Sequence, residues 1–371
     1  MGSTRDSKAV AAERQEIIRQ AVAHMEGSDR SVLLRQIARM ELRDDLRIPE
    51  ALLAQLRTAA PNTPEFYGCW SVARSLLRVA QGASRAERIA RLSLAHVYGG
   101  GTTARLLKGE PAVDVLGSLR ETSERGGFGR QAFESIATFD GEALLAHAEA
   151  DGARYVVPED IDWPETLRAL GEDAPLGLWV RGTASLAELA GTAVAVTGSR
   201  AASDYGKHIA GYLAGGLADR DVTVVAAIGH GADGAALAGA LVRGEAAATP
   251  IGVHAGGVTG PYGEATLRHE RWILSSGGLV VSLCAPGVPL SSARANQRQW
   301  LMTALTSAVV VVEAAIGSRT ANTPRVEGRP LLAVPGPITS SLSAGTNTLI
   351  RDGAAQAVMS VDDITAALAR P

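Results

Sequence analysis

Short apolar, β-branched runs alternate with longer amphipathic segments through the second half of the chain. These runs lie at about residues 193–197, 222–227, 249–253, 279–283, 308–313 and 330–334. Strands separated by helix-length segments are typical of βαβ units, whose parallel strands form a sheet with helices on both faces. The pattern therefore predicts an α/β fold with a doubly wound, mostly parallel sheet. Two earlier runs, at about 153–158 and 175–182, predict further strands.

Apolar residues at helical spacing dominate the chain before residue 150. Helices are expected at about 9–25, 29–42, 49–56, 66–79 and 132–150, with a polar loop at 120–130. Two further helical runs meet at Gly99, Gly100 and Gly101. We expect three parts: an all-helical extension over residues 1–86, a helical domain over 87–150, and the sheet domain over 151–371.

Two features of the helical region leave both a nucleic-acid and a structural interpretation open. The tight glycine turn at residues 99–101 can bring backbone N–H groups to a nucleic-acid phosphate, as in a helix-hairpin-helix, or simply connect two helices. The arginines of residues 1–86 fit a helix-turn-helix. However, acidic residues nearly match them in number, which is typical of a solvated helix face.

Composition limits the functions and the compartment to be considered. With a formal net charge of −3, nucleic acid can bind only through a local basic patch. Aromatic residues make up 4% of the chain, too few for base stacking to dominate. Cys69 and Cys284 lack metal-ligand spacing and are expected to be free and buried, as in a reducing compartment. The polar N-terminus and the lack of a long apolar run predict a cytoplasmic protein without a membrane segment.

The strand expected at 193–197 ends in a turn with the chemistry of a phosphate site. Gly198 lets a ligand approach the backbone, Ser199 supplies a hydroxyl group, and Arg200 supplies a planar cation. A helix is expected to follow, and its first N–H groups have no partner within the helix. A plain strand-to-helix turn with a surface arginine has the same sequence pattern.

Loops after the other strands add glycines, hydroxyls and arginines to the same edge, because parallel strands of such a sheet end together. Asp233 can cap the helix that follows it or hold its loop. Arg298 is expected to open the helix before the 308–313 strand. The sequence thus predicts an edge that binds a polyanion through its phosphates. The candidate residues in these loops are Gly229, His230, Gly231, Asp233, Arg298, Arg319, Gly336, Gly345, Thr346 and Asn347.

The sequence shows no catalytic motif beside these loops. The first glycine loop is not GxGxxG, and a GxxxxGK[ST] loop, Cys/His metal spacing and a Gly-x-Ser-x-Gly elbow are absent. Glu313 ends a strand, but it is a single carboxylate without a partner in the pattern. We therefore expect binding without covalent chemistry, with no cofactor and no metal.

A series of short motifs follows a specific order and spacing along roughly residues 150–365. They are WPETL at 163–167, LWVRG at 178–182, VTGSR at 196–200, GAD at 231–233, VVVEA at 310–314, AVPG at 333–336, GTN at 345–347 and LIRDGA at 349–354. The series resembles the DNA-processing protein A (Smf) family. The resemblance implies a Rossmann-like domain that binds single-stranded DNA, and a protein that loads a RecA-type recombinase during natural transformation. It also implies a homodimer and likens residues 99–101 to the family's sterile-alpha-motif or hairpin region.

The chain departs from the family pattern in several loops. His230 stands where the family's Ala-Arg-Gly-Ile-Asp turn has its arginine, and Arg298-Gln299-Trp300 keeps one arginine of Arg-Asn-Arg. Each lost phosphate contact weakens binding and flattens its salt dependence. The family's frequent C-terminal winged-helix domain is expected to be missing, and the first 85 or so residues match nothing in the family.

Three hypotheses of function follow from these observations. The first is a single-stranded DNA-binding recombination mediator that holds the strand along the carboxyl edge of the sheet. The second is a nucleotide-ligand-binding sensor or nucleotide-processing enzyme on the same fold, which His230 and Glu264 in the altered pocket favour. The third is an accessory interaction protein whose N-terminal helices dock a partner.

Overall fold

A computed structural model describes residues 82–107, 110–124, 130–243 and 248–369. The helices expected before residue 82, the helix-turn-helix hypothesis and Cys69 fall outside these residues. The chain divides into two compact units, one formed by residues 1–88 with 159–161 and the other by residues 89–158 with 162–371. The division into three parts at residues 86 and 150 stays a prediction.

The helical region before the sheet contains a series of short helices. They are α5 (Arg85–Tyr98), α6 (Gly100–Leu107), α7 (Ala112–Glu124), α8 (Arg130–Thr138) and α9 (Gly141–Ala150). The expected junction at the glycines is confirmed: Gly99, with φ of 73°, separates α5 from α6. Two expectations were wrong. Helix α7 continues into the expected loop, and the single helix at 132–150 is two helices, because the Asp140 side chain caps α9 by accepting the Ala143 N–H at 2.8 Å.

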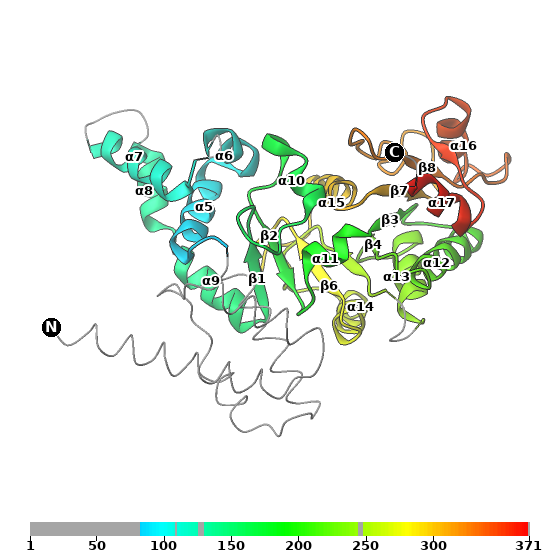
Figure 1. The fold of residues 1–371 in the computed structure, drawn as a ribbon, viewed down its shortest axis with the longest axis horizontal. Coiled ribbons are helices and arrows are strands. Elements are labelled where there is room, and N and C mark those ends of the chain that lie inside the picture. The colour runs from blue at the N-terminus through cyan, green and yellow to red at the C-terminus, as the bar shows by residue number, and fades with distance from the viewer. Residues whose placement is uncertain (1–81, 108–109, 125–129, 244–247, 370–371) are drawn as a thin grey trace, which may run out of the picture. The chain divides into compact units, whose positions relative to one another are not determined.

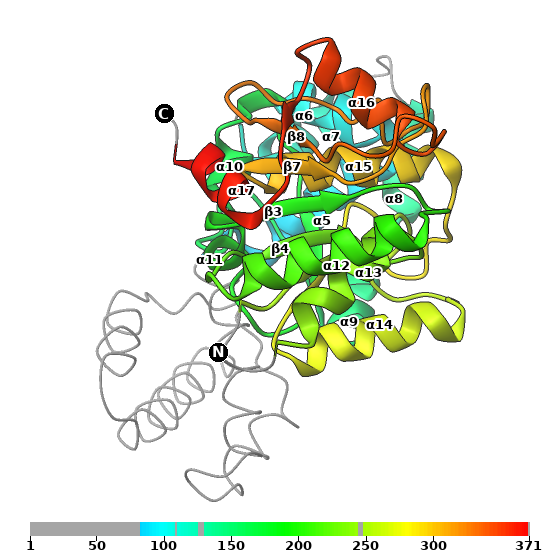
Figure 2. The same ribbon diagram turned by 90° about the vertical axis from the view of Figure 1, so that its right-hand side faces the viewer.

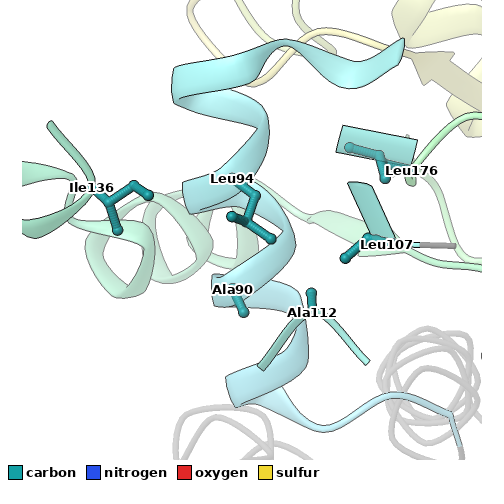
Figure 3. Packing of buried hydrophobic residues seen from close by; sticks show 6 residues of the cluster. All are labelled: Ala90, Leu94, Leu107, Ala112, Ile136 and Leu176. Carbon is teal, nitrogen blue, oxygen red and sulfur yellow. The ribbon is translucent and has the colours of Figure 1, made fainter. Parts of the chain in front are cut away.

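These helices bury a small hydrophobic core of their own (Figure 3). Leu94 of α5 is fully buried, and Ile136 of α8 and Leu107 of α6 complete the cluster with Ala90 and Ala112. Leu176, from the segment just before the second strand, packs into the same core. Because Arg91 of α5 also donates a hydrogen bond to the Leu176 carbonyl at 3.2 Å, the helices are tied to the chain that enters the sheet.

The sheet is mostly parallel, as the hydrophobic pattern predicts. Its strands occur in the order β1-β2-β6-β5-β4-β3-β7-β8-β9. Pairing is parallel from β6 to β9, whereas β1 and β2 form an antiparallel edge. The strands are β1 (Ala153–Val156), β2 (Leu178–Arg181), β3 (Val194–Thr197), β4 (Val224–Ala227), β5 (Ile251–Val253), β6 (Leu279–Ser282), β7 (Ala308–Val311), β8 (Leu331–Ala333) and β9 (Gln356–Ala357).

The order of the strands reverses between β3 and β7, which lie side by side (Figure 2). From β3 the chain steps outward to β6 through α12, α13 and α14, and then α15 carries it back to β7 on the other side of β3. Because such crossovers are right-handed, the reversal places α15 on the opposite face of the sheet from α12, α13 and α14 (Figure 1). The helices are α10 (Glu165–Arg168), α11 (Leu186–Gly191), α12 (Asp204–Ala218), α13 (Ala232–Leu241), α14 (Glu264–Ser275), α15 (Ser292–Leu305), α16 (Ala344–Arg351) and α17 (Val361–Leu368).

A buried ion pair fixes the antiparallel edge of the sheet. Arg154 of β1 donates from Nη2 to Asp162 Oδ2 at 2.9 Å, and both side chains are almost inaccessible to solvent. The other oxygen of Asp162 accepts the Ser185 hydroxyl at 2.7 Å, and Ser185 is the N-cap of α11. The pair therefore joins the edge strand to the start of a helix.

Removal of this carboxylate is expected to destabilise the fold. In Asp162→Ala the Arg154 charge stays buried without its partner, which costs about 3–5 kcal/mol of unfolding free energy. Asp362→Asn is the matched control, since it removes the exposed carboxylate that pairs with Arg220 at 2.8 Å. Urea unfolding of both variants measures the difference; equal, small losses would contradict the structural role of Asp162.

Candidate functional site

A cavity of about 80 Å³ opens at the carboxyl ends of β3, β4 and β7. This is the edge where the strand order reverses, and doubly wound sheets bind their ligands at such switch points. The volume suits a few water molecules or one small anion. The cavity is lined by Gly198, Arg200, Ala227, Gly229, His230, Asp233, Arg298, Gln299, Arg319 and Thr320.

The cavity brings together only part of the predicted set. Of the candidates, it gathers Gly198, Arg200, Gly229, His230, Asp233, Arg298 and Arg319. Sequence reasoning missed Ala227, Gln299 and Thr320 as site residues. Each is adjacent in sequence to a strand end or to a predicted arginine, so proximity to these features was the signal that could have found them.

Arg298 is the central cation of the cavity. It lies inside α15 rather than at the start of that helix, so the expectation that it opens a helix was wrong. Its Nε atom is buried and has no hydrogen-bond partner in the described part of the chain. Burial lowers the pKa of Arg298; Arg200 and Arg319 lower it further, and Asp233 opposes them. This Nε–H is a donor, so an acceptor from a ligand or a water molecule would satisfy it.

The other two arginines approach from the loops after β3 and β7. Arg200 is exposed at the β3 turn. Arg319 donates from Nε to the Asn296 side chain of α15 at 2.5 Å, so its guanidinium is held at the cavity mouth. The Thr320 hydroxyl donates to the Gly198 carbonyl at 3.3 Å, which ties the two loops together. The three arginines thus converge from three separate elements.

Asp233 is the acidic group of the cavity lining. Its Oδ1 accepts the Thr197 hydroxyl at 3.0 Å and the Ala227 N–H at 3.3 Å, so the side chain holds the ends of β3 and β4 together. The N-cap of α13 is Gly231, so of the two predicted roles for Asp233 the structure shows the loop-holding one. Burial raises the pKa of Asp233, against the opposing effects of Arg298 and of these hydrogen bonds.

A glycine allows the turn after β4 to pack closely against the turn after β3. Gly231 has φ of 76°, and a Cβ there would overlap the carbonyl oxygens of Ser199 and Arg200. The Ala232 N–H donates to the Ser199 carbonyl at 3.2 Å across the same junction. Ser199 and Gly231 therefore lie where the turns meet and not in the cavity lining.

The candidates near α16 also lie outside the cavity lining. Asn347 donates from Nδ2 to the Gly336 carbonyl at 3.0 Å and accepts the Gly336 N–H at 3.1 Å. Thr346 is buried and donates to the Ser343 carbonyl at 3.0 Å, while the Gly345 N–H donates to Ala314 at 2.7 Å. These polar groups fix α16 to the loops after β7 and β8.

Glu313 has a partner that the sequence did not show. Its carboxylate accepts the Ser203 N–H at 2.9 Å and the Ser203 hydroxyl at 2.6 Å, and Ser203 is the N-cap of α12. A Cβ at Gly206 would overlap this carboxylate. The expectation of an unpartnered Glu313 was therefore wrong: it anchors α12 at the end of β7 and frames the turn that carries Arg200.

Two further expectations can be compared with the described residues. No helix among them is long and apolar enough to cross a membrane. Cys284 is free, as expected, but it is only partly buried. Burial raises the pKa of its thiol, against the opposing effect of Arg294.

Comparison with known proteins matches residues 154–369 to the family described as DNA recombination-mediator protein A. The putative DNA processing protein DprA of Mycobacterium tuberculosis is 42% identical over 228 residues, 57% of this chain and 57% of that protein. Protein Smf of Escherichia coli is 33% identical over 204 residues, 54% of this chain and 53% of that protein. The match thus spans little more than half the length of these curated relatives.

The fold comparison reaches beyond the matched segment. The X-ray structure of DNA processing protein A from Streptococcus pneumoniae aligns with a TM-score of 0.62 at 26% identity, covering 76% of this chain and 97% of that chain. The Rossmann-like sheet and helices before it are therefore shared with a solved relative. Because the family match covers more than half of the chain, this protein belongs to the DNA recombination-mediator protein A family, which includes DprA and Smf.

Proposed function

We propose that the cavity binds a phosphate group of single-stranded DNA and that the protein acts as a recombination mediator. The observation that carries the proposal is the buried Nε of Arg298, which has no hydrogen-bond partner among the described residues and lies near Arg200 and Arg319. Arginine forks match the geometry of phosphate oxygens, and charge-assisted hydrogen bonds are the strong ones. Membership in a family described by DNA recombination supports a nucleic acid as the source of that phosphate.

The size of the cavity favours contact with the phosphate backbone of DNA over contact with its bases. At about 80 Å³ it admits one phosphate-sized anion, and its lining contains no Phe, Tyr or Trp side chain. Contacts to phosphates position a nucleic acid without reading its sequence. The proposed binding is therefore indifferent to sequence and falls as salt rises.

The wider role follows from the family. In this proposal the bound strand is delivered to a RecA-type recombinase, as in natural transformation, by a cytoplasmic homodimer that performs no covalent chemistry. The second candidate function is the binding of a small nucleotide through its phosphate, which the one-anion size of the cavity favours. A thermal shift with nucleotides but none with oligonucleotides would favour that candidate.

Loss of Arg298 is expected to weaken DNA binding. In Arg298→Gln the buried cation is gone, so the affinity for a short labelled oligothymidine should fall about tenfold or more. The slope of log K against log salt should lose about 0.7, the value of one phosphate contact on a single strand. Fluorescence anisotropy across a salt series measures both quantities.

Arg220→Gln is the matched control for this experiment. Arg220 is also an arginine, but it is exposed and pairs with Asp362 just beyond the far end of α12. It should leave affinity and salt slope unchanged. Equal binding by wild type and Arg298→Gln would overturn the phosphate site.

Release of Arg319 is expected to have a smaller effect. In Asn296→Ala the Arg319 guanidinium loses its 2.5 Å tether and must be ordered on binding, which costs about 0.5–1.5 kcal/mol, or roughly 2- to 10-fold in affinity. Because no charge is removed, the salt slope should stay at the wild-type value. A lower slope in Asn296→Ala would show that the tether does more than position Arg319.

A further inference from the structure

The cavity contains a feature that an anion site does not require. Asp233 lies among its lining residues, and an ionised carboxylate there would repel a phosphate. The side chain is nearly inaccessible, with 8% of its residue surface exposed. A carboxyl group kept at such a position calls for a chemical reason.

The two oxygens of Asp233 have different surroundings. Oδ1 accepts hydrogen bonds from Thr197 and from the Ala227 N–H. Both of these bonds end on Oδ1, and no neighbouring residue in the described ranges donates a hydrogen bond to Oδ2. Since Oδ1 accepts both of these hydrogen bonds, Oδ2 is the oxygen left for a ligand in the cavity.

A phosphodiester presents only acceptors at this position. Its two non-bridging oxygens carry no proton, so they need donors, and a protonated carboxyl group is a donor whereas a carboxylate is not. Resting on the proposed function, we propose that Asp233 binds the DNA phosphate in its protonated form. The Oδ2–H donates to a non-bridging oxygen, and the proton is taken up from solvent when the strand binds.

The charges around Asp233 decide how strongly binding and protonation are coupled. Arg298 of α15 favours the carboxylate form of Asp233, while Arg200 and Arg319 act on Arg298; a bound phosphate offsets the effect of Arg298. His230 lines the cavity, and His269 of α14 lies near His230. Burial, Arg268 and His230 lower the pKa of His269.

The sign of the pH dependence follows from the direction of the shift. Burial already raises the pKa of Asp233, and a bound phosphate raises it further, so protons are taken up between the pKa of the free and of the bound protein. Affinity should therefore rise as pH falls through this window, by up to about tenfold per pH unit. Below the pKa of the free protein the affinity should level off.

The direct test is the proton uptake of the intact protein on binding oligothymidine. Isothermal titration in buffers with different ionisation enthalpies, at constant salt and between about pH 5.5 and 8, gives the number of protons per bound strand. Wild type should take up as much as one proton. Asp233→Asn, which keeps the shape and accepts the same two hydrogen bonds through Oδ1, should still bind but without that uptake. Asp362→Asn is the matched control and should keep the uptake, because this exposed carboxylate lies outside the cavity lining.

A second variant keeps the inference testable if Asp233→Asn fails to fold. In Thr197→Val the carboxylate loses one donor at Oδ1, so its protonated form is favoured and the pH window should move upward. Wild-type binding without proton uptake, or the same uptake in Asp233→Asn, would overturn the inference and leave the proposed function standing. Absence of binding by folded wild type would overturn both.

Asp233→Asn also has an expected effect on stability. Because the pKa is raised in the folded protein, the carboxyl group stabilises the fold below its unfolded pKa, and this contribution is lost as pH rises through the folded pKa. The amide carries no charge, so Asp233→Asn should be more stable than wild type at neutral pH, with the difference shrinking in acid. Urea unfolding at neutral and at acid pH measures the difference in unfolding free energy. A variant that is less stable than wild type at neutral pH would show that the negative charge itself holds β3 to β4.

Discussion

The reversal of strand order between β3 and β7 is the constraint on which the site depends. Since one crossover leaves β3 toward β4 and another arrives at β7 from the far side of the sheet, the chain cannot cover the carboxyl ends of both strands. At this gap the turns after β3 and β7 carry Arg200 and Arg319, and Asp233 lies in the first turn of α13. Arg298 enters the same gap from α15, the helix that makes the return possible.

Rigid supports around the gap decide what it can hold. Glu313 anchors α12 through Ser203, Asp233 joins β3 to β4, and Gly231 lets two turns pack without a side chain between them. The result is a small cavity in which several cations meet one buried acid. A site of this kind favours a single anionic group over an extended ligand surface, so in the proposed function DNA contacts it through one backbone phosphate.

The fold was largely predictable, because the apolar runs are short, β-branched and separated by helix-length segments. Each parallel strand from β3 to β8 falls inside an expected run. The wrong expectations concerned helix ends, which depend on local hydrogen bonds and not on periodicity. Asp140 caps α9 and so divides the helix expected at 132–150. Helix α15 begins at Ser292, well before Arg298. The short edge strand β9, which has no apolar run of its own, was not expected either.

The site was predictable at the level of loops but not of side chains. The residues after β3, β4 and β7 were expected to converge, since parallel strands end together, and their arginines do line the cavity. The sequence could not show that the Asn347 amide bonds to the Gly336 backbone, nor that Glu313 accepts hydrogen bonds from the N-cap of a helix more than a hundred residues away. Such long-range pairs depend on packing, which no spacing of residues in one sequence encodes.

The central claim is that the cavity is a phosphate site, and a structure with bound DNA tests it most directly. We would determine the crystal structure of the full chain with a short oligothymidine. The account predicts one backbone phosphate inside the cavity, accepting a hydrogen bond from Arg298 Nε, which lacks a partner within the described ranges. DNA bound elsewhere on the surface, with the cavity empty of phosphate, would contradict it.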